Sequence, residues 1–339
     1  MPVFNGFRAV IVLACVLGFA ASARADDKAN WDTTVAAARA EGKVVVYNAG
    51  TPAFLREIGN AFQKKYGVAV DVLDGRSSEI RERIRAEHAA GKVAGDVTHT
   101  SSNTASEQAA MELLQPHGFL PKSSAVIAPL KDDGVQVPVL VSRLGILVNT
   151  DLVKSGDEPA TWRDLLAPKW KGKILSDDPR ANGGTYQAFI IFDQVLGRDF
   201  HESLARQDLT FMRENRVAER RVARGEFPIY IMSTISGLIN LKGLPVKVVI
   251  PAEGAPYLVL VNAMLRNAPH PNAGRLFLNF FLEDEAQEIV QKFGYGSATG
   301  ASSDALDASI RPLLQSKLLG TPTLKQQMEM LPVFQSIYK

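Results

Sequence analysis

The segment SDDPRANGGTYQAF, at residues 176–189, places small and polar side chains directly before an apolar stretch that is predicted to be helical. The first N–H groups of a helix have no partner within the helix, and the helix dipole makes this end positive. Such a helix start can hold a carboxylate, phosphate or phosphonate oxygen without a metal ion. The segment therefore predicts an anion site. Its candidate residues are Asp178, Arg180, Asn182, Gly183, Gly184 and Thr185.

Three other turns have the same small, polar character. They follow the predicted strands Lys43–Asn48, Val68–Leu73 and Gly95–Thr100. In open parallel sheets, ligands bind beyond the carboxyl ends of the strands. Helix capping by Ser and Thr explains any one of these turns taken alone, but four such turns at one sheet edge favour a ligand site. The candidate residues in the three turns are Thr51, Ser77, Ser78, Ser101 and Ser102.

Two arginines can supply the positive charge that an anion requires. An arginine binds two oxygens at once through its planar guanidinium, a geometry that lysine lacks. Arg143 lies in an otherwise apolar predicted strand, where an unpaired charge is costly. Arg180 lies in the segment described first. The alternative for each arginine is a salt bridge with a nearby acid.

Patterns typical of enzymes are not found. The five histidines, at positions 88, 99, 117, 201 and 270, do not fall at the H-E-x-x-H spacing of a metal site. No G-x-S-x-G segment is present, and Cys15 is the only cysteine. We therefore expect no enzymatic activity, no cofactor and no metal. A secreted hydrolase is the remote alternative.

The elements that must position these residues alternate between strands and helices. This alternation predicts an α/β fold whose mostly parallel sheets have helices on both faces. Two long extended runs, Val135–Thr150 and Ala255–Leu265, predict that the chain crosses into a second lobe and returns. The predicted division places residues 26–140 and 262–339 in the first lobe and residues 141–261 in the second.

The N-terminus has the pattern of an export signal. Arg8 is followed by the uncharged, mostly apolar run Ala9–Ala21 and then by Ala23-Arg24-Ala25, which suits a signal peptidase. We predict a signal peptide over residues 1–25, cleaved after about Ala25. The alternatives are an N-terminal membrane anchor and a lipoprotein attached at Cys15.

Charge composition limits the classes of partner. Cleavage after Ala25 removes Arg8 and Arg24 but no acid, and leaves equal numbers of basic and acidic residues. Nucleic acids and anionic membranes are bound by proteins with a basic excess on one face. The balance therefore argues against both partners and leaves small ligands and proteins.

Several segments resemble those of one known family. They are Glu158–Leu166 (EPATWRDLL), Pro168–Ile174 (PKWKGKI), Asp178-Pro179 and Ala268–Gly274 (APHPNAG). The sequence resembles the solute-binding proteins of bacterial ABC importers, in the branch that includes the periplasmic ferric-binding proteins. The resemblance covers nearly the whole chain after residue 25. It implies a periplasmic, monomeric protein of type II two-lobed fold, with two crossing strands, that delivers one solute to a membrane permease.

The resemblance also bears on the solute. Ferric-binding members carry adjacent tyrosines after a Gly-Glu-x-Pro segment, which here is Gly225–Pro228, and Ile235-Ser236 takes the place of the pair. The resemblance therefore favours a small organic anion, such as a phosphonate, a sugar phosphate or a carboxylate. A ferric-ion receptor remains the alternative, with iron held by Tyr186, Tyr230 and Tyr257.

The second lobe has further candidate ligand contacts in this interpretation. Ser233 and Thr234 follow the predicted strand Phe227–Met232 and can donate hydroxyl hydrogen bonds. Tyr257, at the return crossing, can stack on an organic ligand or form a hydrogen bond with it.

Overall fold

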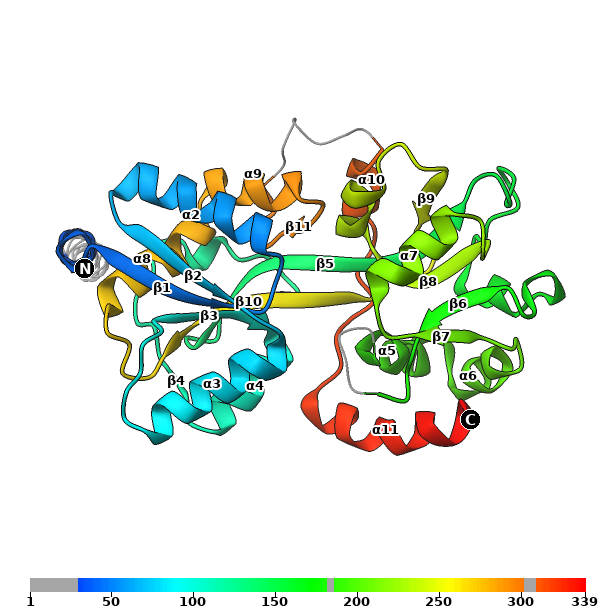
Figure 1. Cartoon of the computed structure of the whole chain (residues 1–339), viewed down its shortest axis with the longest axis horizontal. Coiled ribbons are helices and arrows are strands. Elements are labelled where there is room, and N and C mark those ends of the chain that lie inside the picture. Colours follow the sequence, from blue (N-terminus) through cyan, green and yellow to red (C-terminus); the bar gives the residue numbers. More distant parts are fainter. Residues whose placement is uncertain (1–29, 182–185, 302–308) are drawn as a thin grey trace, which may run out of the picture.

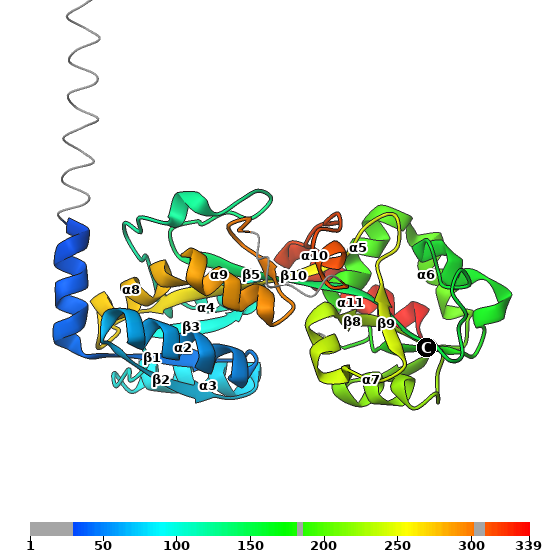
Figure 2. The same ribbon diagram turned by 90° about the horizontal axis from the view of Figure 1, so that it is seen from above.

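The computed structural model describes residues 30–181, 186–301 and 309–339, and these residues form two lobes that lie side by side (Figure 1). Two long strands, β5 (Gln136–Asn149) and β10 (Tyr257–Leu265), run between the lobes. The view from above shows the same separation, with the helical residues 30–41 at the outer end of the first lobe (Figure 2). The predicted two-lobed α/β architecture is confirmed.

The first lobe contains three parallel strands in the order β2-β1-β3. Helix α2 follows β1, and its apolar residues Phe54, Leu55, Ile58 and Phe62 recur at helical spacing, so that they are all buried in one cluster with the sheet. The elements of this lobe are β1 (Lys43–Asn48), α2 (Pro52–Tyr66), β2 (Ala69–Asp74), α3 (Ser77–Ala89), β3 (Val97–Ser101), α4 (Ser102–Ala110), β4 (Leu114–Gln115), η1 (Ser123–Ala125), α8 (Pro271–Phe281), α9 (Asp284–Lys292) and β11 (Gly296–Ser297).

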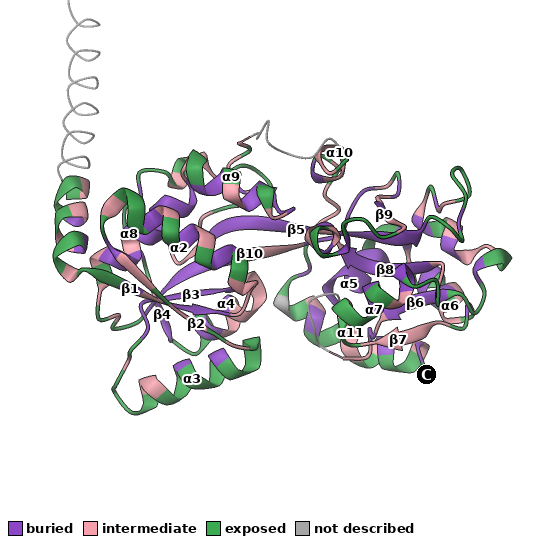
Figure 3. Ribbon diagram, turned by 45° about the horizontal axis from the view of Figure 1, so that its top comes forward, coloured by how far each residue is buried: buried purple, intermediate pink, exposed green. Residues whose placement is uncertain are grey.

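The second lobe repeats this plan with the parallel strands β8, β6 and β7. Trp162, Phe189, Phe192 and Phe200 form much of its core. The central strands of both lobes are largely buried, whereas the edge strands β2 and β7 are only partly buried and the helices expose their outer faces (Figure 3). The elements are η2 (Trp162–Leu166), η3 (Pro168–Trp170), β6 (Ile174–Asp177), α5 (Tyr186–Leu196), α6 (Arg198–Ala205), β7 (Thr210–Met212), α7 (Asn215–Ala223), β8 (Ile229–Thr234), η4 (Ile235–Leu241) and β9 (Val246–Val249).

Strand β5 joins the sheets of the two lobes. Its first half pairs with β10 and β11, and its second half pairs with β8 and β9, all antiparallel. The resulting order is β2-β1-β3-β10-β5-β8-β6-β7. Both crossing strands that the sequence predicts are therefore present, and their bounds lie within two residues of the predicted ones.

The C-terminal segment differs from the predicted division of the chain, which placed residues 262–339 in the first lobe. Helices α10 (Arg311–Leu314) and α11 (Leu324–Ile337) pack on the second lobe (Figure 1). Phe334 and Tyr338 are buried in its core, beside Phe189. The apolar pattern of α11 predicts a buried face, but a pattern does not say which of two cores receives that face.

No helix in the described part of the chain is long and apolar enough to cross a membrane. The predicted signal peptide, residues 1–25, lies outside the described residues.

Candidate functional site

A cavity of about 600 Å³ lies between the two lobes, and we call it the interlobe cavity. Ser142 and Leu258, which pair across the two crossing strands, line its back. Each lobe supplies one wall. The first lobe contributes Thr51, Pro52, Ala53, Arg56, Phe293 and Tyr295, and the second contributes Asn215, Arg216, Glu219, Arg220, Thr234, Ser236, Gly237, Ile239, Asn240 and Leu241.

The first wall is the start of helix α2. Thr51 stands at the N-cap without capping the helix through its side chain, and its hydroxyl lies 3.0 Å from the hydroxyl of Tyr295. The N–H groups of Ala53 and Phe54 have no acceptor among the described residues. Free N–H groups at the positive end of a helix attract anions, so this wall can accept negatively charged oxygen.

The second wall combines the starts of α7 and η4. The Thr234 hydroxyl accepts the N–H of Gly237 at 3.2 Å and the hydroxyl hydrogen of Ser236 at 3.2 Å. Asn215, the first residue of α7, accepts a hydrogen bond from the Tyr230 hydroxyl at 3.0 Å. The amide N–H groups of Asn215 are thus held in place by a buried tyrosine and can donate to a ligand.

Three arginines give the interlobe cavity its positive charge. Arg56 comes from α2 in the first lobe, and Arg216 and Arg220 come from α7 in the second. None of the three side chains forms an ion pair or a hydrogen bond with another residue in the described ranges. Their guanidinium groups are therefore free to bind the oxygens of an anion that touches both lobes.

Glu219 is the one acid on the wall among the residues that the structure describes. It is buried, and its Oε1 accepts a hydrogen bond from the Ser233 hydroxyl at 3.0 Å. Burial raises the pKa of the Glu219 carboxyl, against the hydrogen bond from Ser233 and the charge of Arg216. The cavity wall thus carries three arginines without an ion pair and one buried acid.

The structure brings two of the residues predicted from strand ends, Thr51 and Thr234, to opposite walls of the cavity. The four serines of the first lobe are not on its wall. Ser77 and Ser78 are exposed at the start of α3. Ser101 caps α4 by accepting the N–H of Thr104, and Ser102 donates to Gln136 Oε1 at 2.9 Å. Ser233 is buried against Glu219.

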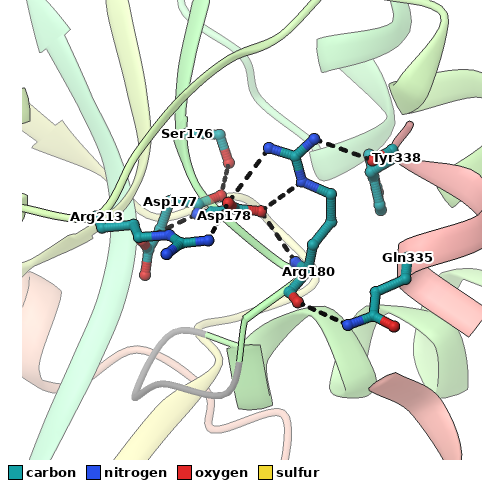
Figure 4. A network of polar contacts seen from close by, with 7 residues as sticks. All are labelled: Ser176, Asp177, Asp178, Arg180, Arg213, Gln335 and Tyr338. Carbon is teal, nitrogen blue, oxygen red and sulfur yellow. Dashed lines mark hydrogen bonds and ion pairs between the residues drawn. The ribbon is translucent and has the colours of Figure 1, made fainter. Parts of the chain in front are cut away.

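Asp178 and Arg180 belong to a network of their own, at the end of β6 (Figure 4). Arg180 Nε donates to Asp178 Oδ1 at 2.8 Å, and Arg213 lies 3.3 Å from Asp178 Oδ2. Arg180 also stacks over Phe211 and donates to the backbone carbonyl of Tyr338. Burial acts to raise the pKa of Asp178, but the arginine hydrogen bonds outweigh it and lower that pKa. Asn182, Gly183, Gly184 and Thr185 lie outside the described residues.

Arg143 and Tyr257 pair across β5 and β10, next to the cavity-lining pair Ser142 and Leu258. Because neighbouring residues of a strand point to opposite faces, Arg143 and Tyr257 lie behind the cavity. Arg143 Nε donates to the carbonyl of Ser316 at 3.4 Å, and burial lowers the pKa of its guanidinium to about 10. No acid in the described ranges pairs with Arg143.

The three tyrosines of the iron hypothesis have separate surroundings. Tyr186 donates to the carbonyl of Gln327 at 2.5 Å, Tyr230 donates to Asn215, and Tyr257 lies behind the cavity. Burial raises the pKa of Tyr186 to about 12 and also raises the pKa values of the other two. The described residues contain no cluster of three or more His, Cys, Asp or Glu suited to a metal.

Sequence reasoning missed all four charged residues of the wall, which are Arg56, Glu219 and the two arginines of α7. A usable signal exists in the segment NRVAER, at residues 215–220, because Arg216 and Arg220 are four residues apart and so share a helix face. The strand before this helix, β7, has only three residues. A hydrophobic pattern of three residues is too short to predict a strand. The sequence therefore did not indicate that α7 begins at the end of a strand.

Comparison with known proteins identifies the family. The family model for bacterial extracellular solute-binding proteins matches residues 44–296. The chain belongs to this family. A protein of unassigned function from Haemophilus influenzae is 28% identical to it over 270 residues, which cover 76% of this chain and 78% of that protein. A Salmonella typhimurium periplasmic protein, provisionally assigned to 2-aminoethylphosphonate binding, is 26% identical over 251 residues, covering 70% and 71%.

Solved structures show that the fold of this solute-binding protein is shared. The periplasmic binding protein AfuA of Actinobacillus pleuropneumoniae, with fructose-6-phosphate bound, has a TM-score of 0.68 at 23% identity and covers 88% of this chain and 98% of its own. Iron-bound HitA of Pseudomonas aeruginosa has a TM-score of 0.70 at 20% identity, covering 87% and 99%. The family and fold implied by the sequence resemblance are therefore confirmed.

Proposed function

We propose that this solute-binding protein is the periplasmic receptor of an ABC importer and that it captures a small organic phosphonate or phosphate. The observation that carries the proposal is the set of three unpaired arginines, Arg56, Arg216 and Arg220, on facing walls of one cavity. Phosphoryl oxygens suit the arginine fork and the free N–H groups of α2. The relatives provisionally assigned to 2-aminoethylphosphonate support the same class of solute.

The two walls explain how such a solute closes the protein. Only a ligand that contacts both lobes favours the closed form over the open one. An anion held by Arg56 on one side and by Arg216 and Arg220 on the other meets this condition. Closure then presents the loaded receptor to the permease. We expect a monomer that performs no reaction on its solute.

Thermal unfolding and isothermal titration calorimetry test the proposal. The probes are 2-aminoethylphosphonate, fructose-6-phosphate, succinate and ferric citrate, each added to the purified protein. We expect at least one of the two phosphorus compounds to bind and to raise the melting temperature, because a ligand that binds only the folded state stabilises it. A rise with ferric citrate alone would overturn the proposal in favour of an iron receptor.

A matched pair of variants locates the site. Arg216→Gln removes a cavity arginine, whereas Arg85→Gln removes another exposed arginine, which pairs with Glu82 on α3. We expect weaker binding in the first variant and unchanged binding in the second. Equal effects of the two substitutions would place the solute elsewhere. Release of inorganic phosphate from fructose-6-phosphate would favour the hydrolase alternative.

A further inference from the structure

Glu219 is unusual because it is a buried acid with one oxygen left unpartnered. Its exposed fraction is 4%, and it lies on the wall of the interlobe cavity. Oε1 accepts the Ser233 hydroxyl, but Oε2 has no hydrogen-bond donor in the described part of the chain. Oε2 is not shut off from solvent, so it opens into the cavity, where a bound ligand can reach it. Oε2 of Glu219 is therefore an unpaired carboxylate oxygen on the cavity wall that can accept a hydrogen bond from a ligand.

The backbone on two sides positions this carboxylate. The pairing of β5 and β8 shifts its register at Met232, whose φ is 77°, so that Met232 is the extra residue of a β-bulge. As a result, the successive residues Ile231 and Met232 both lie in the core that α5 covers. The shift turns Ser233 to the face covered by α7, where it donates to Glu219. A Cβ on Gly237 would lie 2.5 Å from Glu219 Oε1, so the lack of a side chain at residue 237 makes room for the carboxylate.

The charged and titratable groups around Glu219 do not neutralise it. Arg216 and Arg220 lie on the same helix, and neither reaches ion-pair distance of its carboxylate among the described contacts. From β8, Ser233 contributes a neutral hydroxyl and Tyr230 a neutral phenol. From η4, Gly237 contributes backbone only. The three arginines of the cavity can bind the anionic group of a solute, and the Glu219 carboxylate remains available to a different group of the same solute.

We propose that Glu219 Oε2 binds a positively charged amino group of the solute, so that the receptor selects aminoalkyl phosphonates over phosphonates without an amine. This inference rests on the proposed function. An ammonium group supplies both the missing donor and the missing positive charge, whereas a hydroxyl supplies only the donor. Burial raises the pKa of Glu219 by more than the Ser233 hydrogen bond and the charge of Arg216 lower it, as expected for a carboxylate without a close ion pair.

Calorimetry with two ligands that differ only in the amine tests the proposal. 2-Aminoethylphosphonate and ethylphosphonate are titrated into the wild-type protein and into Glu219→Gln, which keeps an oxygen for Ser233. We expect the wild type to prefer the amino compound by about tenfold to a hundredfold, the range of a charge-assisted hydrogen bond. We expect Glu219→Gln to lose this preference while its affinity for ethylphosphonate does not fall.

A second measurement uses the wild-type protein alone and so does not depend on folding of the variant. Lowering the pH from about 5.5 to about 3.5 protonates a carboxyl whose pKa lies above its usual value of about 4.3, whereas the phosphonate group of each ligand keeps about one negative charge over this range. The ratio of the two affinities is therefore expected to fall as the pH falls. A ratio that does not change with pH would overturn the proposal.

The remaining outcomes separate this inference from the proposed function. Equal binding of both ligands by the wild type would overturn the inference and leave the proposed function standing. Equal losses for both ligands in Glu219→Gln would also overturn it, because Glu219 would then act on the phosphonate end. Binding of neither phosphonate and of no sugar phosphate would overturn the proposed function and the inference with it.

Discussion

Two groups of arginines in the second lobe have different surroundings, although Arg213 of the first group lies only three residues before Arg216 of the second. Arg180 and Arg213 both bind the buried carboxylate of Asp178. Arg216 and Arg220 follow Arg213 by three and seven residues, line the interlobe cavity, and have no acidic partner within the described ranges. The first group stabilises the end of β6, and the second is free for a ligand. Pairing, and not residue type, distinguishes the two roles.

The comparison also changes the meaning of the segment at residues 176–189. Its arginine satisfies the salt-bridge alternative, since Arg180 is held by Asp178 and by the carbonyl of Tyr338. The anion-binding role that the sequence assigns to this segment is better supported on α7. Asn182–Thr185 stay a prediction, because they lie outside the described residues.

The largest effect is expected when the free arginines are removed. In the double variant Arg216→Gln and Arg220→Gln, affinity for the bound phosphonate or phosphate should fall about a hundredfold or more, since two charge-assisted hydrogen bonds contribute about 1.5–3 kcal/mol each. The free energy of unfolding without ligand should stay within about 0.5 kcal/mol of the wild type. Calorimetry and urea unfolding measure the two quantities. An unchanged affinity of the double variant for the solute would contradict a binding role for Arg216 and Arg220.

The opposite pattern is expected for the paired arginines. Arg180→Gln should lower the free energy of unfolding by about 2 kcal/mol, because the buried Asp178 loses one of its two cations. Solute affinity should change less than about threefold. Urea unfolding and calorimetry of the same preparation provide the check. A large loss of affinity without a loss of stability would move Arg180 into the binding site.

A pH experiment sharpens the comparison within the paired region, because Asp177 lies beside Asp178 but lacks its close arginine pairing. Burial raises the pKa of Asp177 to about 6, helped by the charge of Asp178. The native state therefore retains this proton to higher pH than the unfolded state does. The resulting stabilisation is complete below about pH 4 and is lost as the pH rises through about 6.

Asp177→Asn removes the titration and keeps an oxygen for the N–H of Asp178. Relative to the wild type, the variant should gain about 1 kcal/mol more stability at about pH 7.5 than at about pH 4, allowing for partial exposure of the group to solvent. Urea unfolding at both pH values measures the difference. A difference of zero, or one of opposite sign, would contradict the assigned pKa direction.

The smallest effect is expected at a neutral contact on the first wall. Tyr295→Phe removes the hydroxyl that lies 3.0 Å from Thr51, while the ring keeps its packing on Phe54. Affinity should fall about threefold to fivefold, the size of one neutral hydrogen bond. Calorimetry of this variant beside the arginine variants ranks the neutral contact against the charged ones. A loss as large as that of the double variant would make hydrogen bonding, and not charge, the main source of affinity.

The sequence predicted the elements well because hydrophobic patterns are local. The runs at Lys43–Asn48 and Val135–Thr150 are long and apolar, so the strands β1 and β5 follow from them almost residue by residue. The family resemblance rested on short segments such as EPATWRDLL, and the family is confirmed.

The wall of the cavity was less predictable because it depends on tertiary contacts. Nothing in the sequence distinguishes Arg213 from Arg216. The two residues flank the start of α7, and only the folded chain shows that Arg213 reaches Asp178 whereas Arg216 lines the cavity. The burial of Glu219 depends on a strand irregularity at Met232 that has no glycine to mark it. The position of α11 on the second lobe depends on a choice between two apolar cores.

Tyr338, the penultimate residue, lies in the core of the second lobe, where its hydroxyl bonds with His201 at 2.7 Å. The first lobe likewise needs α8, which begins only at Pro271, to complete its core. Neither lobe can therefore finish folding during synthesis until most of the polypeptide has left the ribosome.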